Sequence, residues 1–136
     1  MIIQKVRLSF MVLLVFGFLA CDDDSDDRNK FAGRYEVKEQ SLETFVPRND
    51  YEVRIRKDLA TIDQIIINNF YNLDIDVYAV VSGSSVTIPR QQHQVYEYKG
   101  SGNMSGNVIT VEYTVSSTQD DSSFFDRLRA EMTLID

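Results

Sequence analysis

The chain has 136 residues, of which 43% are hydrophobic, and it carries 14 Lys and Arg residues against 21 Asp and Glu residues. This length is suited to one domain, and the formal net charge of −7 argues against a nucleic-acid partner, because phosphate recognition needs a basic face. One Cys excludes an internal disulfide and a metal site built from cysteines, and one His leaves little for catalysis or transition-metal binding.

The first 20 residues have the form of a secretory signal peptide. Lys5 and Arg7 precede an apolar run over residues 8–19, which ends at Ala20 and Cys21. A helix of about twelve residues is short of the ~30 Å of hydrocarbon that a membrane span must cross. The segment therefore predicts a cleaved leader and not a mature transmembrane helix.

Residues 18–21 (Phe-Leu-Ala-Cys) resemble the lipobox of bacterial lipoproteins. In that motif the cysteine sulfur receives a diacylglycerol, and cleavage after a small residue makes the cysteine residue one of the mature chain. The resemblance implies lipidation of Cys21, cleavage between Ala20 and Cys21, and attachment to a membrane through acyl chains, each buried methylene of which contributes about 0.8 kcal/mol. The alternative is an incidental cysteine behind an ordinary signal peptide, but no competing cleavage site lies nearby.

Five carboxylates follow the cysteine within six residues: Asp22, Asp23, Asp24, Asp26 and Asp27. A block of like charge predicts a solvated, extended tether over residues 21–30. The run also resembles the export signal of Bacteroidota-type surface lipoproteins, which implies a lipid-anchored protein of the outer membrane that faces the cell exterior. Calcium binding is the less favoured alternative, because the Gly and the closing Glu of an EF-hand loop are missing.

Residues 31–136 predict an all-β domain, because their apolar residues recur with period two. Clear alternation covers residues 34–38, 51–56, 74–81, 109–116 and 127–134, and shorter segments at 63–68, 86–89 and 95–104 complete eight candidate strands. Gly100 and Gly102 predict a bulge or sharp coiling in the sixth strand. Short connections join neighbours antiparallel, so we expect an antiparallel, eight-stranded up-and-down meander that forms a barrel or half-barrel.

Four segments of this domain resemble small lipocalin-like lipoproteins of the same bacterial group: residues 31–37, 65–70, 86–89 and 106–115. Gly33-Arg34-Tyr35 stands where a lipocalin has Gly-x-Trp at the start of its first strand. In lipocalins an Arg of the last strand covers that aromatic ring, whereas alternation here points Arg127 and Arg129 outward. The resemblance implies a lipocalin-like barrel with an internal cavity and, in many relatives, no assigned activity.

Candidate catalytic residues are few. His93 lies in a polar segment, residues 90–94, which we expect to link two strands, without a partner that suggests catalysis. Asp74 and Asp76 alternate with apolar residues and are expected on the outside of the sheet. The sequence contains no phosphate-binding loop, nucleophile elbow or metal-binding helix motif. We therefore expect no enzyme activity, no metal and no cofactor.

Five of the seven tyrosines share the apolar register of the strands: Tyr35, Tyr51, Tyr96, Tyr98 and Tyr113. The favoured interpretation is that their rings pack in the core and their hydroxyls lie at a wet rim. The alternative is that they line a cavity for a small apolar or glycan-like ligand. The inward residues predict a mostly filled interior with a shallow mouth.

Two hypotheses for function remain. The first is a membrane-anchored binding module of lipocalin-like shape at the cell surface. The second is a non-catalytic accessory protein of an envelope assembly, in which exposed aromatic residues at loop ends are expected to contact a protein partner that the sequence does not identify. These aromatic residues are Phe45, Phe70, Tyr71, Phe124 and Phe125.

Overall fold

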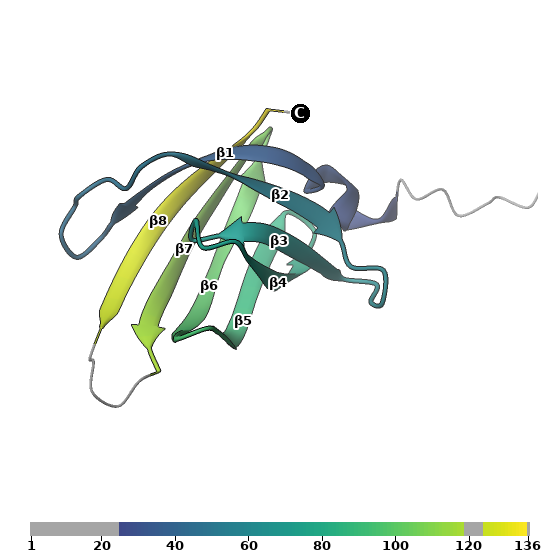
Figure 1. Ribbon diagram of the computed structural model, residues 1–136. Coiled ribbons are helices and arrows are strands. Elements are labelled where there is room, and N and C mark those ends of the chain that lie inside the picture. Colours follow the sequence, from purple (N-terminus) through teal and green to yellow (C-terminus); the bar gives the residue numbers. More distant parts are fainter. Residues whose placement is uncertain (1–24, 119–123, 136) are drawn as a thin grey trace, which may run out of the picture.

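The computed structural model describes residues 25–118 and 124–135, which form a closed β-barrel (Figure 1). A short 3-10 helix, η2 (Asp27–Lys30), precedes eight strands: β1 (Gly33–Ser41), β2 (Tyr51–Lys57), β3 (Gln64–Phe70), β4 (Ile75–Ser82), β5 (Ser85–His93), β6 (Tyr96–Ser105), β7 (Val108–Ser117) and β8 (Phe125–Leu134). Each strand pairs antiparallel with the next, and β1 pairs with β8. The expected all-β, eight-stranded meander is confirmed, and it closes into a full barrel.

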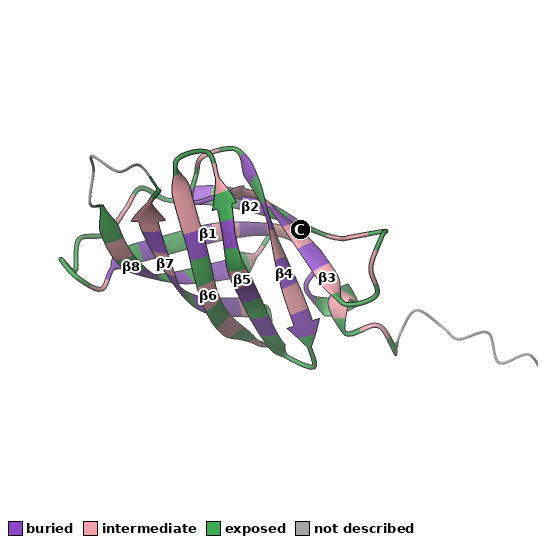
Figure 2. Ribbon diagram, turned by 90° about the horizontal axis from the view of Figure 1, so that it is seen from below, coloured by how far each residue is buried: buried purple, intermediate pink, exposed green. Residues whose placement is uncertain are grey.

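Alternation along the strands builds the core. Buried and exposed bands alternate along the strands in Figure 2, as the period of two requires. In β2, for example, Tyr51, Val53 and Ile55 are buried while the residues between them are exposed. Arg127 and Arg129 of β8 are exposed, as their register predicts.

Irregularity in the ladder changes the register at two places, between Asn68 and Phe70 and between Ile88 and Gln91. Asn69 adopts a left-handed conformation with φ 65°, and the following Phe70 and Tyr71 are buried. The expectation that Phe70 and Tyr71 are exposed at a loop end is therefore wrong, because the irregularity turns both rings toward the interior. Phe45, Phe124 and Phe125 are exposed, as expected.

The glycines of β6 permit a close approach to β7 without a bulge between these two strands, which pair continuously. A Cβ atom at Gly102 would lie 2.0 Å from the Thr110 carbonyl oxygen, and one at Gly100 would lie 2.5 Å from the Glu112 carbonyl oxygen. The register shift lies instead in the pairing of β5 with β6, beside Gly100.

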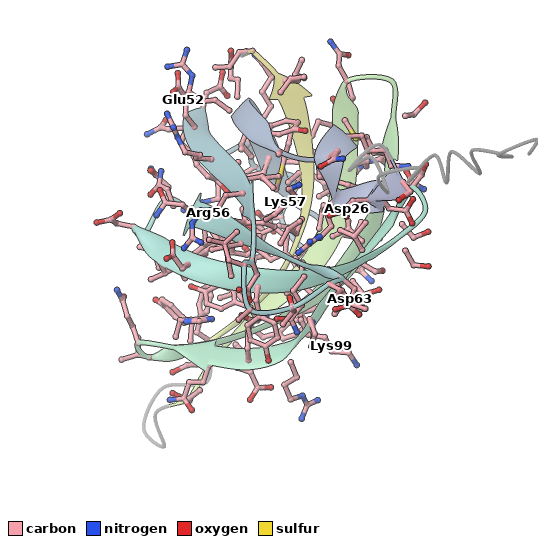
Figure 3. All side chains as sticks on the ribbon, turned by 90° about the vertical axis from the view of Figure 1, so that its right-hand side faces the viewer. Asp26, Glu52, Arg56, Lys57, Asp63 and Lys99 are labelled. Carbon is pink, nitrogen blue, oxygen red and sulfur yellow. The ribbon has the colours of Figure 1, made fainter. Side chains whose placement is uncertain are left out.

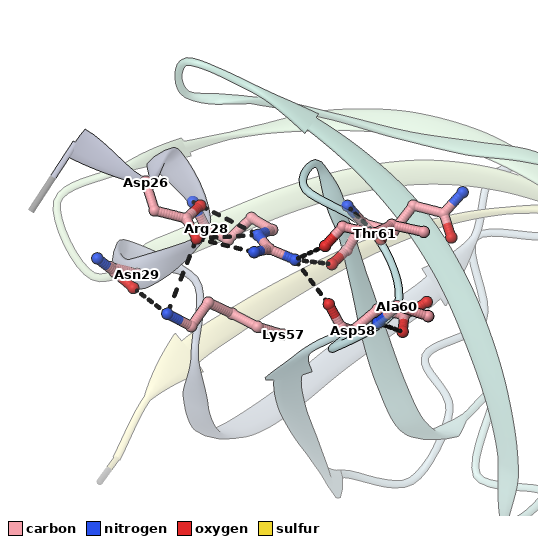
Figure 4. Close-up of polar contacts among 8 residues, drawn as sticks. Asp26, Arg28, Asn29, Lys57, Asp58, Ala60 and Thr61 are labelled. Atoms are coloured by element: carbon pink, nitrogen blue, oxygen red, sulfur yellow. Dashed lines mark hydrogen bonds and ion pairs between the residues drawn. The ribbon is translucent and has the colours of Figure 1, made fainter. Parts of the chain in front are cut away.

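One end of the barrel carries η2, and we call it the η2 end. Figure 4 shows the guanidinium of Arg28 there, bonded to the Asp26 carboxylate and to backbone carbonyl oxygens of the β2–β3 connection. Asp27 accepts a hydrogen bond from the Gly83 amide at 2.9 Å. Residues 26–30, which the charge pattern assigns to the tether, thus belong to the folded unit.

Candidate binding site at the mouth of the barrel

At the end opposite η2, strands β1, β3, β5 and β7 end and strands β2, β4, β6 and β8 begin (Figure 1), and we call this end the mouth. Polar side chains point into the barrel near this end. Two of them follow the inward register of β1, in which Tyr35 and Val37 precede Glu39 and Ser41. The mouth therefore differs from the remaining interior, which is apolar.

Glu39 is the charged centre of this region and is only 4% exposed. Its Oε2 accepts hydrogen bonds from the Tyr51 hydroxyl at 3.0 Å and the Tyr113 hydroxyl at 2.6 Å, and its Oε1 forms an ion pair with Arg48. Three donors thus compensate the desolvated carboxylate. Burial, followed by the charge of Glu39, raises the pKa of the Tyr51 hydroxyl, so it remains a donor at neutral pH.

Arg48 covers this centre from the β1–β2 connection. Its guanidinium carbon lies 3.9 Å from the centroid of the Tyr71 ring, and its Nη2 donates to the Tyr71 carbonyl oxygen at 3.2 Å. Although burial disfavours the charged form, the Glu39 carboxylate raises the pKa of Arg48. The Arg48 side chain is 30% exposed, so it forms the boundary between the buried carboxylate and solvent.

Aromatic rings pack beside this ion pair. Tyr98 contacts Phe70, Tyr71 and Tyr96 edge-on, with ring centroids 5.5, 5.9 and 6.4 Å apart. Phe124 extends the row outward, 5.8 Å from Tyr96. Within the described part of the chain, the Tyr98 hydroxyl is buried without a hydrogen-bond partner. Such an unmade bond costs about 1–3 kcal/mol, which a ligand atom at this position would recover.

A side chain replaces backbone pairing between β4 and β5 near the mouth. The ladder of these strands ends at Val80 and Thr87. Beyond that point the Gln91 amide accepts from the Tyr78 amide at 3.1 Å and donates to the Tyr78 carbonyl oxygen at 2.8 Å. Beyond the backbone ladder, the Gln91 side chain therefore bridges β4 and β5.

His93 is the last residue of β5, and not part of a link between strands as its polar neighbours suggest. Its Nε2 lies 2.7 Å from the Gln91 Oε1. Burial lowers the pKa of His93, so the neutral ring is favoured at neutral pH. The sequence of this polar segment predicts a loop and not a strand, because its inward residues, Gln91 and His93, are themselves polar.

The five tyrosines of the expected cavity are divided between the two ends. The Tyr35 hydroxyl donates to the Phe31 carbonyl oxygen at 2.8 Å near η2, and burial raises the pKa of Tyr35 to about 12. Tyr51 and Tyr113 bind Glu39, whereas Tyr96 and Tyr98 belong to the aromatic row. Four of the five therefore lie at the mouth, and whether they bind a ligand stays a prediction.

Other predicted residues lie away from the mouth or outside the described residues. Asp74 falls in the β3–β4 turn and Asp76 in β4; both are exposed, as expected. Asp76 accepts from Asn68 at 2.8 Å. The described residues do not include Ala20, Cys21, Asp22, Asp23 and Asp24.

Grooves also occur on the outer surface of the barrel. One of about 600 Å³ lies across β5 to β8, with Lys99, Thr114 and Arg127 among its lining residues. A second, of about 430 Å³, lies beside the β1–β2 connection, where Lys38 and Asp50 line it together with Glu39 and Arg48 of the mouth. The first groove is lined largely by outward-facing, solvated side chains, whereas the second adjoins the mouth, which we favour as the binding region.

Sequence reasoning missed Glu39, Arg48 and Gln91. Glu39 could have been found, because it continues the inward register of Tyr35 and Val37. Arg48 belongs to a connection without periodicity, and Gln91 follows a register shift. Neither residue therefore had a sequence pattern that predicted an inward side chain.

The arrangement offers aromatic faces, an internally neutralised ion pair and one free buried hydroxyl. In residues 25–118 and 124–135 there is no group of three or more His, Cys, Asp and Glu side chains that could hold a metal. No helix in the same ranges has the length and hydropathy needed to cross a bilayer. These groups are suited to noncovalent binding of a small molecule.

The fold and mouth thus define an eight-stranded, up-and-down antiparallel β-barrel with two different ends. Comparisons with protein families, curated proteins and solved structures give no match.

Proposed function

We propose that the chain is a lipid-anchored, lipocalin-like lipoprotein of the cell surface that binds a small apolar or glycan-like ligand at the mouth of its barrel. The observation that carries the binding proposal is the buried, unpartnered hydroxyl of Tyr98, whose ring packs against Tyr71 and Tyr96. A buried donor without a partner is uncommon in folded proteins. An acceptor atom of a ligand would satisfy it.

The charges at the mouth favour a neutral ligand. Arg48 is already paired with Glu39, so a carboxylate or phosphate would have to compete with a buried partner. The net charge of −7 also repels anions. Aromatic faces bind flat apolar rings or the apolar face of a sugar, while the Tyr98 hydroxyl supplies one directional contact.

Binding can be tested by NMR titration of the intact protein in detergent with three neutral probes: coumarin, naphthalene and cellobiose. Coumarin has a carbonyl acceptor that naphthalene lacks. We expect coumarin or cellobiose to bind, and Tyr98→Phe to weaken that binding about tenfold, the equivalent of one hydrogen bond.

Tyr78→Phe is the matched control, because Tyr78 lies on β4 outside the aromatic row and its side chain is only partly buried. It should leave binding unchanged. The ligand proposal is contradicted if none of the three probes binds, or if Tyr98→Phe and Tyr78→Phe bind equally well.

A second candidate function is an accessory role in an envelope assembly. Phe45 and Phe124 lie in connections at the mouth and are 70% and 41% exposed, and Phe125, the first residue of β8, is 58% exposed. Such side chains anchor protein partners. In-cell cross-linking should capture a partner with the native chain and lose it with Phe45→Ser and Phe125→Ser. Capture of the monomer alone would argue against this role.

The anchor is tested separately. Cys21→Ala should yield an uncleaved or soluble precursor, and unchanged membrane partitioning would refute lipidation. Neutral residues in place of Asp22, Asp23, Asp24, Asp26 and Asp27 should leave the protein on the periplasmic side if the run is an export signal. Unaltered digestion by a protease added to whole cells would refute that signal.

A further inference from the structure

Two apolar side chains at the η2 end are almost completely exposed. Leu59 is 97% exposed and Ile62 is 90% exposed, the highest values among the large apolar residues that the structure describes. Both belong to the six-residue β2–β3 connection, residues 58–63. Isolated exposed apolar residues are common on proteins, but here two share one short connection.

The connection has a defined conformation. Arg28 Nη1 donates to the carbonyl oxygens of Asp58 at 2.9 Å, Thr61 at 2.9 Å and Gln64 at 3.0 Å (Figure 4). The Asp58 amide donates to the Gln64 carbonyl oxygen at 3.0 Å, and the Asp58 side chain accepts from the Ala60 amide at 2.9 Å. The backbone carbonyls therefore point inward to Arg28, and the connection holds Leu59 and Ile62 in solvent.

The expected anchor is close to this connection. Figure 3 faces the η2 end and shows Asp26 beside Lys57, whose charged groups lie 3.8 Å apart. Lys57 directly precedes the connection. Cys21 is five residues before Asp26, so even a fully extended chain places the lipidated sulfur within about 17–20 Å of this ion pair.

We infer that Leu59 and Ile62 insert into the membrane that holds the acyl chains of Cys21, so that the β2–β3 connection is a second membrane contact. This inference rests on the lipidation in the proposed function. The acyl chains keep the η2 end at the surface, and two apolar side chains on a fixed connection then enter the boundary between headgroups and acyl chains. The mouth, at the opposite end of the barrel, faces away from the membrane (Figure 1).

Charge favours a lipid surface without net negative charge. Asp58 and Asp63 flank the two apolar residues, and Asp22, Asp23 and Asp24 lie between the connection and the anchor in the chain. Carboxylates are repelled by anionic headgroups. The partner that fits is therefore a zwitterionic lipid surface, and vesicles of phosphatidylcholine are the probe.

Site-specific fluorescence tests the inference. The sulfur of a lipidated Cys21 is blocked, so Leu59→Cys, Ile62→Cys and Phe45→Cys would each introduce the one reactive thiol of the chain. The intact lipidated proteins are labelled with an environment-sensitive dye and bound to phosphatidylcholine vesicles that contain lipids with a quencher on the acyl chain. Phe45 is the matched control, because it is 70% exposed at the mouth.

We expect dyes at positions 59 and 62 to shift to the blue and to be quenched at least twofold more strongly than a dye at position 45. Equal quenching at the three positions, stronger quenching at position 45, or no quenching on vesicle-bound protein would each overturn the inference. Intact-mass analysis separates the two proposals: a residue 21 without lipid overturns both, whereas lipidated protein with unquenched positions 59 and 62 overturns only the second contact.

Discussion

Glu39 is a buried carboxylate at the mouth, and its charge has to be compensated by neighbouring side chains. Its carboxylate is removed from water and depends on Arg48, Tyr51 and Tyr113. A buried ion pair adds little net stability when it forms, but removing one partner leaves an uncompensated charge. The pair therefore fixes the position of the β1–β2 connection over the barrel more than it stabilises the fold.

Arg48→Ala should lower the free energy of unfolding by about 3 kcal/mol, because it leaves the Glu39 carboxylate buried without its cation. Urea denaturation measures this loss. Lys38→Ala is the control, because Lys38 is exposed on the outer face of β1, the strand that carries Glu39. Its effect on the free energy of unfolding should stay within about 0.5 kcal/mol. Equal effects of both substitutions would show that Glu39 has other compensation.

Loss of the hydroxyl group should have opposite effects on stability at Tyr113, which has a hydrogen-bond partner, and at Tyr98, which has none among the described residues. Tyr113→Phe removes a 2.6 Å bond to Glu39 and should cost about 1–3 kcal/mol. Tyr98→Phe removes an unpartnered buried hydroxyl and should leave the ligand-free protein as stable or more stable. A thermal unfolding midpoint of Tyr98→Phe well below that of the native protein would show that the Tyr98 hydroxyl has a partner.

The lowered pKa of Asp26, at the η2 end, predicts that the folded protein loses stability in acid. Its side-chain hydrogen bond with Arg28 is the main reason that the pKa of Asp26 falls from 3.8 to about 2. Since the folded-state pKa is the lower one, this contribution to stability is complete above about pH 4 and is lost as the pH falls toward 2. The free energy of unfolding, measured from pH 5 to pH 2, should therefore fall less steeply for Asp26→Asn than for the native chain.

At the scale of elements, the strands could be predicted because alternation specifies one buried face. The clearest segments, such as residues 51–56 and 109–116, lie within β2 and β7 with their apolar residues inward. The prediction of exposed residues failed where the strand register shifts, because the irregularity at Asn69 buries Phe70 and Tyr71. The polar end of β5 was missed for a similar reason, because Gln91 substitutes for a strand partner.

The close contact of β6 with β7 gives a prediction at this scale. Gly102→Ala would place a methyl group 2.0 Å from the Thr110 carbonyl oxygen, and the strands would have to separate. We expect a loss of about 3 kcal/mol or more, at or above the upper end for overpacked sites. Ser101→Ala, on the exposed face next to it, should be nearly neutral. Chemical denaturation that shows equal stability for both variants would contradict the tight approach.

At the scale of the whole molecule, the two ends of the barrel have different chemistry. The η2 end is held by Arg28 and carries Leu59 and Ile62, while the mouth carries the Glu39–Arg48 pair and the aromatic row. Sequence alone did not predict this division. The tyrosines share one register along the strands, but only the closure of the barrel decides which end each one occupies.

Closure itself predicts that the barrel folds as one unit. β1 pairs with both β2 and β8, so the first and last strands are neighbours. Removal of residues 125–136 would expose the edges of β1 and β7 and much of the core, and we expect no cooperative unfolding transition from such a chain. A sharp thermal transition in the truncated protein would show that seven strands suffice.

The pairing of β1 with β8 also has a consequence for biosynthesis. β8 is the last strand of the barrel to be synthesised, so β1 lacks one of its two neighbouring strands until then. For the proposed exported protein, the growing polypeptide would therefore have no finished barrel that could block a narrow translocation channel. The same late pairing would keep the barrel open until β8 has been made.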